Sequence, residues 1–188
     1  LKREKEIDIE GKFTSKFNLN EKEINRLIAK SNIKFPQKNK VNVKGSLIHN
    51  FFLKIDKNFK LTDYEYKSNG NISESQLVLK DPIKSSFLES PIKKFSIFKT
   101  NLEINLNKKN NNLLMIDGLY NLGGIENKKF KISHDLNKKN PKYLLDFDLA
   151  ENIFIEIINF KTNHKNGSNI QSEMRFKNNN VIFNYIKF

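Results

Sequence analysis

Apolar and polar residues alternate with a period of two along most of this chain. The clearest run covers residues 98–106, whose first phase holds Phe98, Thr100, Leu102, Ile104 and Leu106. Lys99, Asn101, Glu103 and Asn105 occupy the other phase. Because successive side chains of a β-strand point to opposite faces, this spacing predicts a strand with one apolar and one polar face.

Similar alternating runs recur from residue 7 to the C-terminal end, separated by short polar segments. The segments D-K-N at residues 56–58, S-N-G-N at residues 68–71 and D-P at residues 81–82 have the composition of turns. This spacing predicts about eleven to thirteen short strands joined as an antiparallel meander. The fold class is therefore all-β, and the pattern leaves open whether the sheet is curled and open or closed as a sandwich or barrel.

One short helix is predicted near the N-terminus, over residues 20–30. Asn20 can cap it and Glu23 follows three residues later, as in a capping box. Ile24, Leu27 and Ile28 then form a narrow apolar stripe, so we expect this helix to cover an end or edge of the sheet.

Composition favours strands and argues against a nucleic-acid partner. The chain has 16 Phe and no Trp, and its net charge is +13. Its basic residues are almost all Lys, whereas Arg is the usual choice for bidentate phosphate and base recognition. Lysine accompanies many Asn and Ile, which A- and T-rich codons encode, so we interpret the charge as compositional drift on solvated faces.

The aromatic residues Phe13, Phe98, Phe147 and Phe176 fall in the apolar phase, opposite the Lys phase, and do not form a basic stacking platform.

Residues for catalysis, metal binding or cofactor binding are not grouped in the sequence. The chain has no Cys, and His49, His134 and His164 are dispersed without a second ligand at metal-binding spacing. It contains neither a nucleophile elbow nor a glycine-rich phosphate loop. We therefore expect a protein that is not an enzyme and that needs no cofactor. We also expect no transmembrane helix and no signal peptide within this stretch, because it has no run of 18 apolar residues.

Residues 146–176 resemble a segment of the AsmA-like family, in particular its YhdP branch. A strand ending in Asp148-Leu149 precedes a short polar step, an apolar strand and a Lys-rich loop with Gly167. The other matching residues are Ile155, Ile157, Phe160 and Lys161. The pieces V-N-V-K-G-S-L, N-G-N-I and M-I-D-G-L-Y are similar to the strand-and-glycine units of the same proteins. Typical members carry Lys-Pro or a similar pair near the loop, where this chain has Lys161-Thr162.

This resemblance implies a bridge-like lipid transporter: an elongated antiparallel meander curled into an open, taco-like groove. Residues 1–188 would form one segment of a longer protein, with strands and the short helix in residues 1–39 and a continuous meander in residues 40–188. The protein would lie in the periplasm of a Gram-negative bacterium and be anchored to the inner membrane through a segment outside this chain. Phospholipid or another acyl-chain lipid would run along the apolar concave face between the inner and outer membranes. Its other partners would be flanking segments of the same protein, with no nucleic acid.

The residues predicted to face lipid share the apolar phase of their strands. They are Val41, Val43, Leu47, Leu77, Leu79, Phe98, Leu102, Ile104, Leu106, Leu114, Ile116, Leu145, Phe147, Leu149, Ile153, Ile155, Ile157, Met174 and Phe176. Two alternatives stay open: a β-sandwich module of an envelope protein, which would use exposed edge strands for assembly, and a basic domain that binds nucleic acid.

Overall fold

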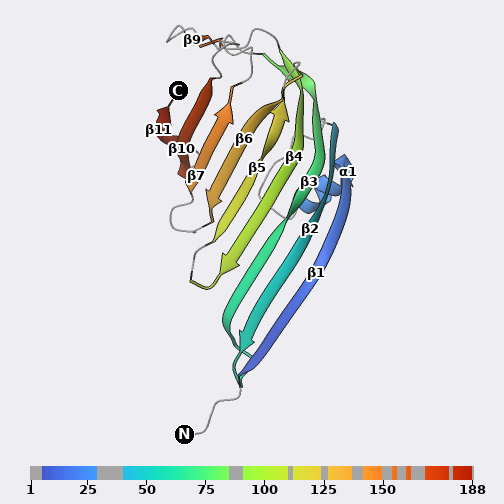
Figure 1. The fold of residues 1–188 in the computed structure, drawn as a ribbon, viewed down its shortest axis with the longest axis vertical. Helices are drawn as coiled ribbons and strands as arrows, with labels where there is room; N and C mark the ends of the chain where they lie inside the picture. The colour runs from blue at the N-terminus through green and yellow to red at the C-terminus, as the bar shows by residue number, and fades with distance from the viewer. Residues whose placement is uncertain are drawn as a thin grey trace.

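Nine strands form one antiparallel sheet in the computed structural model of this chain (Figure 1). The structure describes residues 6–28, 40–84, 91–109, 112–123, 127–136, 142–149, 154–155, 160–161, 168–177 and 180–187. The strands lie in the order β1-β2-β3-β4-β5-β6-β7-β10-β11, and each is hydrogen-bonded to its neighbours in this order. The predicted all-β meander is therefore confirmed.

The first four strands are longer than those that follow them. The nine strands are β1 (Ile7–Asn20), β2 (Lys40–Ile55), β3 (Leu61–Ile83), β4 (Ile92–Asn107), β5 (Leu113–Asn121), β6 (Lys128–Asp135), β7 (Lys142–Asp148), β10 (Asn169–Lys177) and β11 (Asn180–Lys187). Two further strands, β8 (Phe154–Ile155) and β9 (Phe160–Lys161), pair only with each other. The chain therefore leaves the main sheet after β7 and rejoins it at β10.

The helix α1 (Glu21–Ile28) begins directly after β1, where the capping box was predicted. The Oδ1 atom of Asn20 accepts hydrogen bonds from the backbone N–H groups of Lys22, at 2.9 Å, and Glu23, at 3.3 Å. In return, the backbone N–H of Asn20 donates to Oε2 of Glu23 at 2.8 Å. These bonds satisfy amides that the first turn of a helix leaves without partners. They fix the point at which the chain changes from strand to helix.

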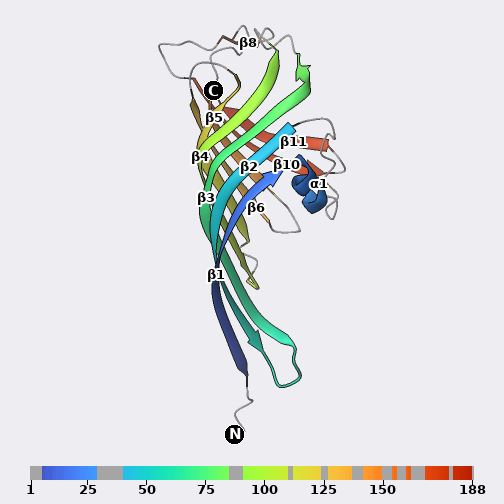
Figure 2. The same ribbon diagram turned by 90° about the vertical axis from the view of Figure 1, so that its right-hand side faces the viewer.

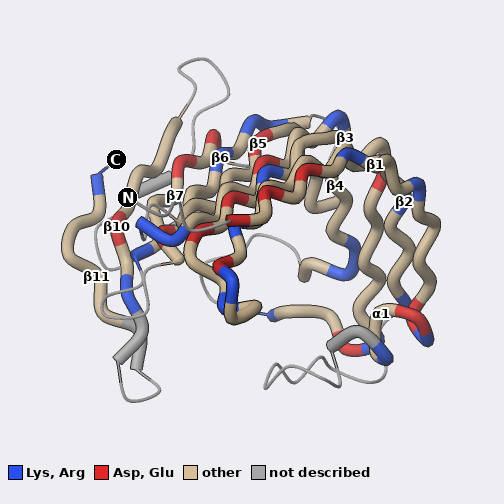
Figure 3. The backbone as a smooth tube through the Cα atoms, turned by 90° about the horizontal axis from the view of Figure 1, so that it is seen from below, with Lys and Arg blue, Asp and Glu red and all other residues tan. Residues whose placement is uncertain are grey.

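The sheet is strongly curled and open at both edges. Seen along its long direction, it forms an arch with α1 near one end and β11 near the other (Figure 3). The view in Figure 2 shows the same curvature from the side, with α1 and β11 on the side towards which the sheet bends. Among the described residues, β1 pairs only with β2 and β11 only with β10, so the sheet does not close. The prediction of an open, curled sheet is confirmed, and the described strands do not form two packed sheets.

The predicted turn at residues 68–71 is wrong, because β3 continues through them. Ser68 is 1% exposed, and Asn69 and Asn71 point to the opposite, polar face. A Cβ atom added to Gly70 would lie 2.1 Å from the backbone oxygen of Ser46 and 2.8 Å from Cα of Leu47. The glycine therefore allows a close approach of β2 to β3, which is the other common role of a glycine inside a strand. Residues 81–82 likewise lie inside β3 and do not end it.

The predicted turn between β2 and β3 is confirmed. Oδ1 of Asp56 accepts hydrogen bonds from the backbone N–H groups of Asn58, at 2.8 Å, and Lys60, at 2.9 Å.

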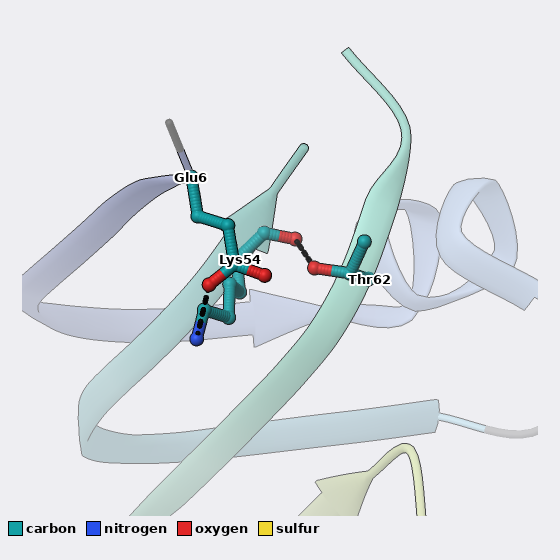
Figure 4. A network of polar contacts seen from close by, with 3 residues as sticks. All are labelled: Glu6, Lys54 and Thr62. Atoms are coloured by element: carbon teal, nitrogen blue, oxygen red, sulfur yellow. Dashed lines mark hydrogen bonds and ion pairs between the residues drawn. The ribbon is translucent and has the colours of Figure 1, made fainter. Parts of the chain in front are cut away.

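Beside this turn, Nζ of Lys54 lies 2.7 Å from Oε2 of Glu6, and Oγ1 of Thr62 donates to the backbone oxygen of Lys54 (Figure 4). The hydrogen bond to Glu6 and the charge of Glu6 raise the pKa of the Lys54 ammonium group. These contacts connect β1, β2 and β3 at the end of the sheet that carries the turn.

Candidate functional site

One face of the sheet is apolar across all nine strands. Residues directly opposite each other in an antiparallel pair lie on the same face, so the register defines this face strand by strand. One row across the sheet contains, in order from β1 to β11, Ser15, Leu47, Gly70, Leu102, Ile116, Ile132, Leu145, Ser172 and Ile186. The adjacent row that runs from Phe13 to Met174 also contains His49, Ser68 and His134 among its apolar residues. We call this face the apolar trough.

The apolar trough lies on the inside of the curve. Seven described side chains are buried, and the apolar trough contains six of them: His49, Ser68, Thr100, Tyr120, Phe130 and Ser172. The seventh is Ser96, which lies in the opposite phase. No second layer of described strands covers the apolar trough, so its side chains are buried against one another. Side chains on a concave face converge, whereas those on a convex face spread apart, and this geometry accounts for the difference.

Four aromatic rings from β4, β5, β6 and β7 pack together in the apolar trough. Tyr120 stacks on Phe95 with a centroid separation of 6.2 Å and meets Phe130 and Phe147 edge-on, at 6.3 and 5.7 Å. Phe130 and Phe147 stack on each other at 5.9 Å. Such offset and edge-to-face pairs are favourable beyond the area that they bury. The Tyr120 hydroxyl donates to the backbone oxygen of Asp148 at 2.6 Å, so its polar end is satisfied.

Glycines in the apolar trough allow close packing at points where a Cβ atom would not fit. A Cβ atom on Gly118 would lie 2.5 Å from Oγ1 and 2.8 Å from Cα of Thr100, which is fully buried. A Cβ atom on Gly11 would overlap the ring of Phe51, its direct partner across the β1–β2 pair. The ring of Phe51 therefore occupies the space over Gly11, an arrangement in which an aromatic side chain covers a glycine of an edge strand.

The register places charged residues of both signs on the convex face. Lys54 lies opposite Asp8 on one side and Asp63 on the other. Farther along the sheet, Lys131 lies between Asp117 and Asp146 in the same way. Binding of a nucleic-acid backbone uses a continuous basic groove or stripe, which this alternation of sign interrupts.

Most of the predicted lipid-facing residues lie in the apolar trough. The register or the strand phase places there Val41, Val43, Leu47, Leu77, Leu79, Leu102, Ile104, Leu106, Leu114, Ile116, Leu145, Phe147 and Met174. Leu149 follows the last residue of β7, and its backbone N–H donates to the backbone oxygen of Ser168 at 2.6 Å. All of these side chains are partly exposed, so a ligand lying in the apolar trough could touch them.

Phe98 lies on the convex face, whereas the sequence pattern predicts it on the apolar face. It lies opposite Glu74 and Leu119, in the polar phase, whereas Leu102 and Ile116 share the apolar phase. The cause is a bulge in which Lys99 and Thr100 both lie opposite Gly118, with a φ of 46° at Lys99. One extra residue in a strand reverses the faces of all residues beyond it.

Four predicted residues have side chains outside the described part of the chain. Ile153 and Ile157 belong to undescribed segments. Ile155 lies in β8 and Phe176 in β10, but only their backbones are described. Ile155 therefore pairs with Phe160 in the small two-stranded sheet, not in the nine-stranded sheet.

The prediction missed polar residues that lie within the apolar trough. His49 is 8% exposed and contacts Ser15 and Tyr66 through its two ring nitrogens, at 2.8 and 2.7 Å. Its phase was available from the sequence, because His49 continues the series of Val43 and Leu47 with a spacing of two. Among the described residues, no group of three His, Asp or Glu side chains is arranged to hold a metal ion.

Comparisons with known proteins give no relative from which a function could be transferred. No family model, curated protein or solved structure matches this chain. In the described part of the chain, no helix has the length and apolar character needed to cross a membrane. We therefore infer the function from the apolar trough and its chemistry.

Proposed function

We propose that this chain is a non-enzymatic segment of a lipid-transfer protein, which holds acyl chains along the apolar trough. The longer protein would carry phospholipid through the periplasm between the inner and outer membranes of a Gram-negative cell. This assignment extends the sequence resemblance to AsmA-like proteins, and the trough geometry supports it. The segment would supply one part of a longer apolar path.

The observation that carries the proposal is a continuous apolar face without a covering layer. A protein that exposes a large contiguous apolar surface generally uses it to bind a partner, a membrane or a ligand. In the apolar trough, the apolar rows cross all nine strands, and Ile7, Ile9 and Phe13 at one edge are 46, 40 and 50% exposed. An acyl chain matches this surface because it is flexible, apolar and long enough to lie along several rows.

An interaction module is the second candidate, since the outer edge of β1 has no partner strand among the described residues. Edge strands can recruit another strand through their free backbone groups. An edge contact would not, however, use the inner rows of the apolar trough. Lipid binding accounts for the apolar interior of the face, and we therefore prefer it.

Native mass spectrometry of the purified chain tests the proposal. We expect adducts with the masses of phospholipids, which organic extraction should release and identify. Leu102→Asp should remove them, because it places a charge in the middle of the apolar trough. Asn71→Asp on the convex face is the matched control and should keep them. A folded wild-type chain that takes up no lipid from vesicles would contradict the proposal.

A further inference from the structure

A chain of hydrogen-bonded polar side chains crosses three strands inside the apolar trough. Oγ of Ser15 on β1 lies 2.8 Å from Nε2 of His49 on β2. Nδ1 of His49 lies 2.7 Å from the hydroxyl of Tyr66 on β3. The ring of Phe13 stacks on His49 with a centroid separation of 4.3 Å and an angle of 17° between the planes. We call Ser15, His49 and Tyr66 the polar station.

The polar station is surrounded by apolar side chains of the same face. In register, the neighbours of His49 along and across the strands include Leu47, Phe51 and Phe13. Ser68 lies directly opposite His49 on β3, and its buried Oγ atom has no hydrogen-bond partner. A buried polar group without a partner lowers stability, and an apolar side chain of similar size would avoid that cost. Because the arrangement lowers the stability of the fold, packing alone does not explain it. Binding of a ligand would.

The two hydroxyl groups retain capacity for further hydrogen bonds. A hydroxyl has one donor and two acceptor sites, and each of Ser15 and Tyr66 uses one contact to His49. Both residues are partly exposed, in contrast to His49 between them. The polar station thus presents two hydroxyl groups towards the space in which a ligand of the apolar trough would lie.

We infer that the polar station binds the uncharged polar part of an acyl lipid, its ester carbonyl or hydroxyl oxygens. This inference rests on the proposed function and adds a position at which the lipid is held in register. An ester or hydroxyl group fits better than a phosphate, because the register places no Lys or Arg beside His49 in the apolar phase. Phosphate sites are generally built from Arg, Lys or helix N-termini.

The experiment compares two apolar probes that differ in polar groups. Dioleoylglycerol has ester carbonyls and one hydroxyl, whereas octadecane has none. Binding of each probe to the full chain is measured by native mass spectrometry and by displacement of a fluorescent fatty acid. The test variants are Ser15→Ala with Tyr66→Phe, which removes only hydroxyl groups, and His49→Leu, which removes the polar centre. Ser75→Ala, in the same apolar phase of β3, is the matched control.

We expect both test variants to bind dioleoylglycerol roughly tenfold more weakly, the loss expected for one or two hydrogen bonds. Octadecane binding should stay at the wild-type level, and Ser75→Ala should bind both probes normally. The midpoint of thermal unfolding should fall in the hydroxyl-only variant, because it leaves both ring nitrogens of the buried His49 without partners. Equal binding of dioleoylglycerol by wild type and by both variants would overturn the polar station while leaving the lipid-binding proposal intact. Failure of the wild-type chain to bind either probe would overturn both. Should His49→Leu fail to fold, the hydroxyl-only variant decides the question.

Discussion

The two faces of this sheet are made by the same strands, yet they differ in burial and chemistry. On the concave side, Tyr120 and Phe130 are 4 and 6% exposed although no second layer of described strands covers them. On the convex side, Lys131 lies directly opposite Asp117 on one neighbouring strand and Asp146 on the other, so charges of both signs alternate across the sheet. The curl therefore allows a single layer to form a partly closed apolar interior. A flat sheet with the same sequence would leave its apolar face fully exposed.

The apolar face of this sheet differs from that of a β-sandwich in what covers it. In a sandwich, a second sheet would cover it, and its residues would serve only stability. Here the described strands leave it accessible, so stability and ligand binding depend on the same side chains. A substitution should therefore have effects of different size on the two faces.

A charge in the apolar trough should have the largest effect. Leu102→Asp should lower the free energy of unfolding by about 2–4 kcal/mol, since the carboxylate loses hydration without gaining a partner. Asn71→Asp, on the exposed convex face of β3, should change it by less than about 0.5 kcal/mol. Urea unfolding followed by circular dichroism gives both values. Similar losses for the two variants would show that the faces do not differ in burial.

A single methyl group at Gly118 should have the next largest effect. Gly118→Ala places its Cβ against Oγ1 and Cα of Thr100, and overpacking of this kind costs about 1–3 kcal/mol. Asp117→Ala, one residue earlier and on the convex face, is the control. It removes an exposed hydrogen bond from Asn101 and should cost less than Gly118→Ala. Chemical unfolding of both variants provides the comparison, which an unchanged stability of Gly118→Ala would contradict.

The hydroxyl of Tyr120 should contribute less than either. Tyr120→Phe keeps the aromatic cluster and removes the hydrogen bond to the backbone oxygen of Asp148. We expect a loss of about 1 kcal/mol. The midpoint of thermal unfolding should fall accordingly, while acyl-chain binding stays unchanged. A loss of binding equal to that of Leu102→Asp would mean that the hydroxyl itself contacts the ligand.

The smallest predicted effect belongs to the convex face and depends on pH. Hydrogen bonds from Asn184 and Lys142 hold the pKa of the Glu173 carboxyl below its ordinary value of 4.5. Because the folded pKa is lower than the unfolded one, this contribution is present above pH 4.5 and is lost as the pH falls through the folded pKa. Glu173→Gln should therefore reduce the acid dependence of stability slightly. Parallel stability curves for wild type and variant from neutral to acidic pH would refute this.

The sequence pattern predicted the strand faces wherever alternation is unbroken. Leu102, Ile104 and Leu106 lie in the apolar trough as expected, because a period of two translates directly into a face. The capping box of Asn20 and Glu23 likewise predicted where α1 begins, since both partners are local in sequence.

Features that depend on contacts between distant residues were not predictable in this way. Gly70 was expected in a turn, but it lies in β3 because β2 approaches it closely there. Phe98 was assigned to the apolar face, and a bulge at Lys99 reverses that assignment. The polar station was missed because Ser15, His49 and Tyr66 are far apart in the sequence and meet only through the register of three strands.

The most direct test of the central claim compares adjacent residues on opposite faces. The chain has no Cys, so Ile116→Cys and Asp117→Cys can each be labelled at a single position with a fluorophore. The labelled proteins are then loaded with phospholipid that carries a spin-label quencher in its acyl chain. We predict strong quenching at position 116, in the apolar trough, and little at position 117, on the convex face. Equal quenching at both positions, or none at position 116, would contradict the claim that the apolar trough holds acyl chains.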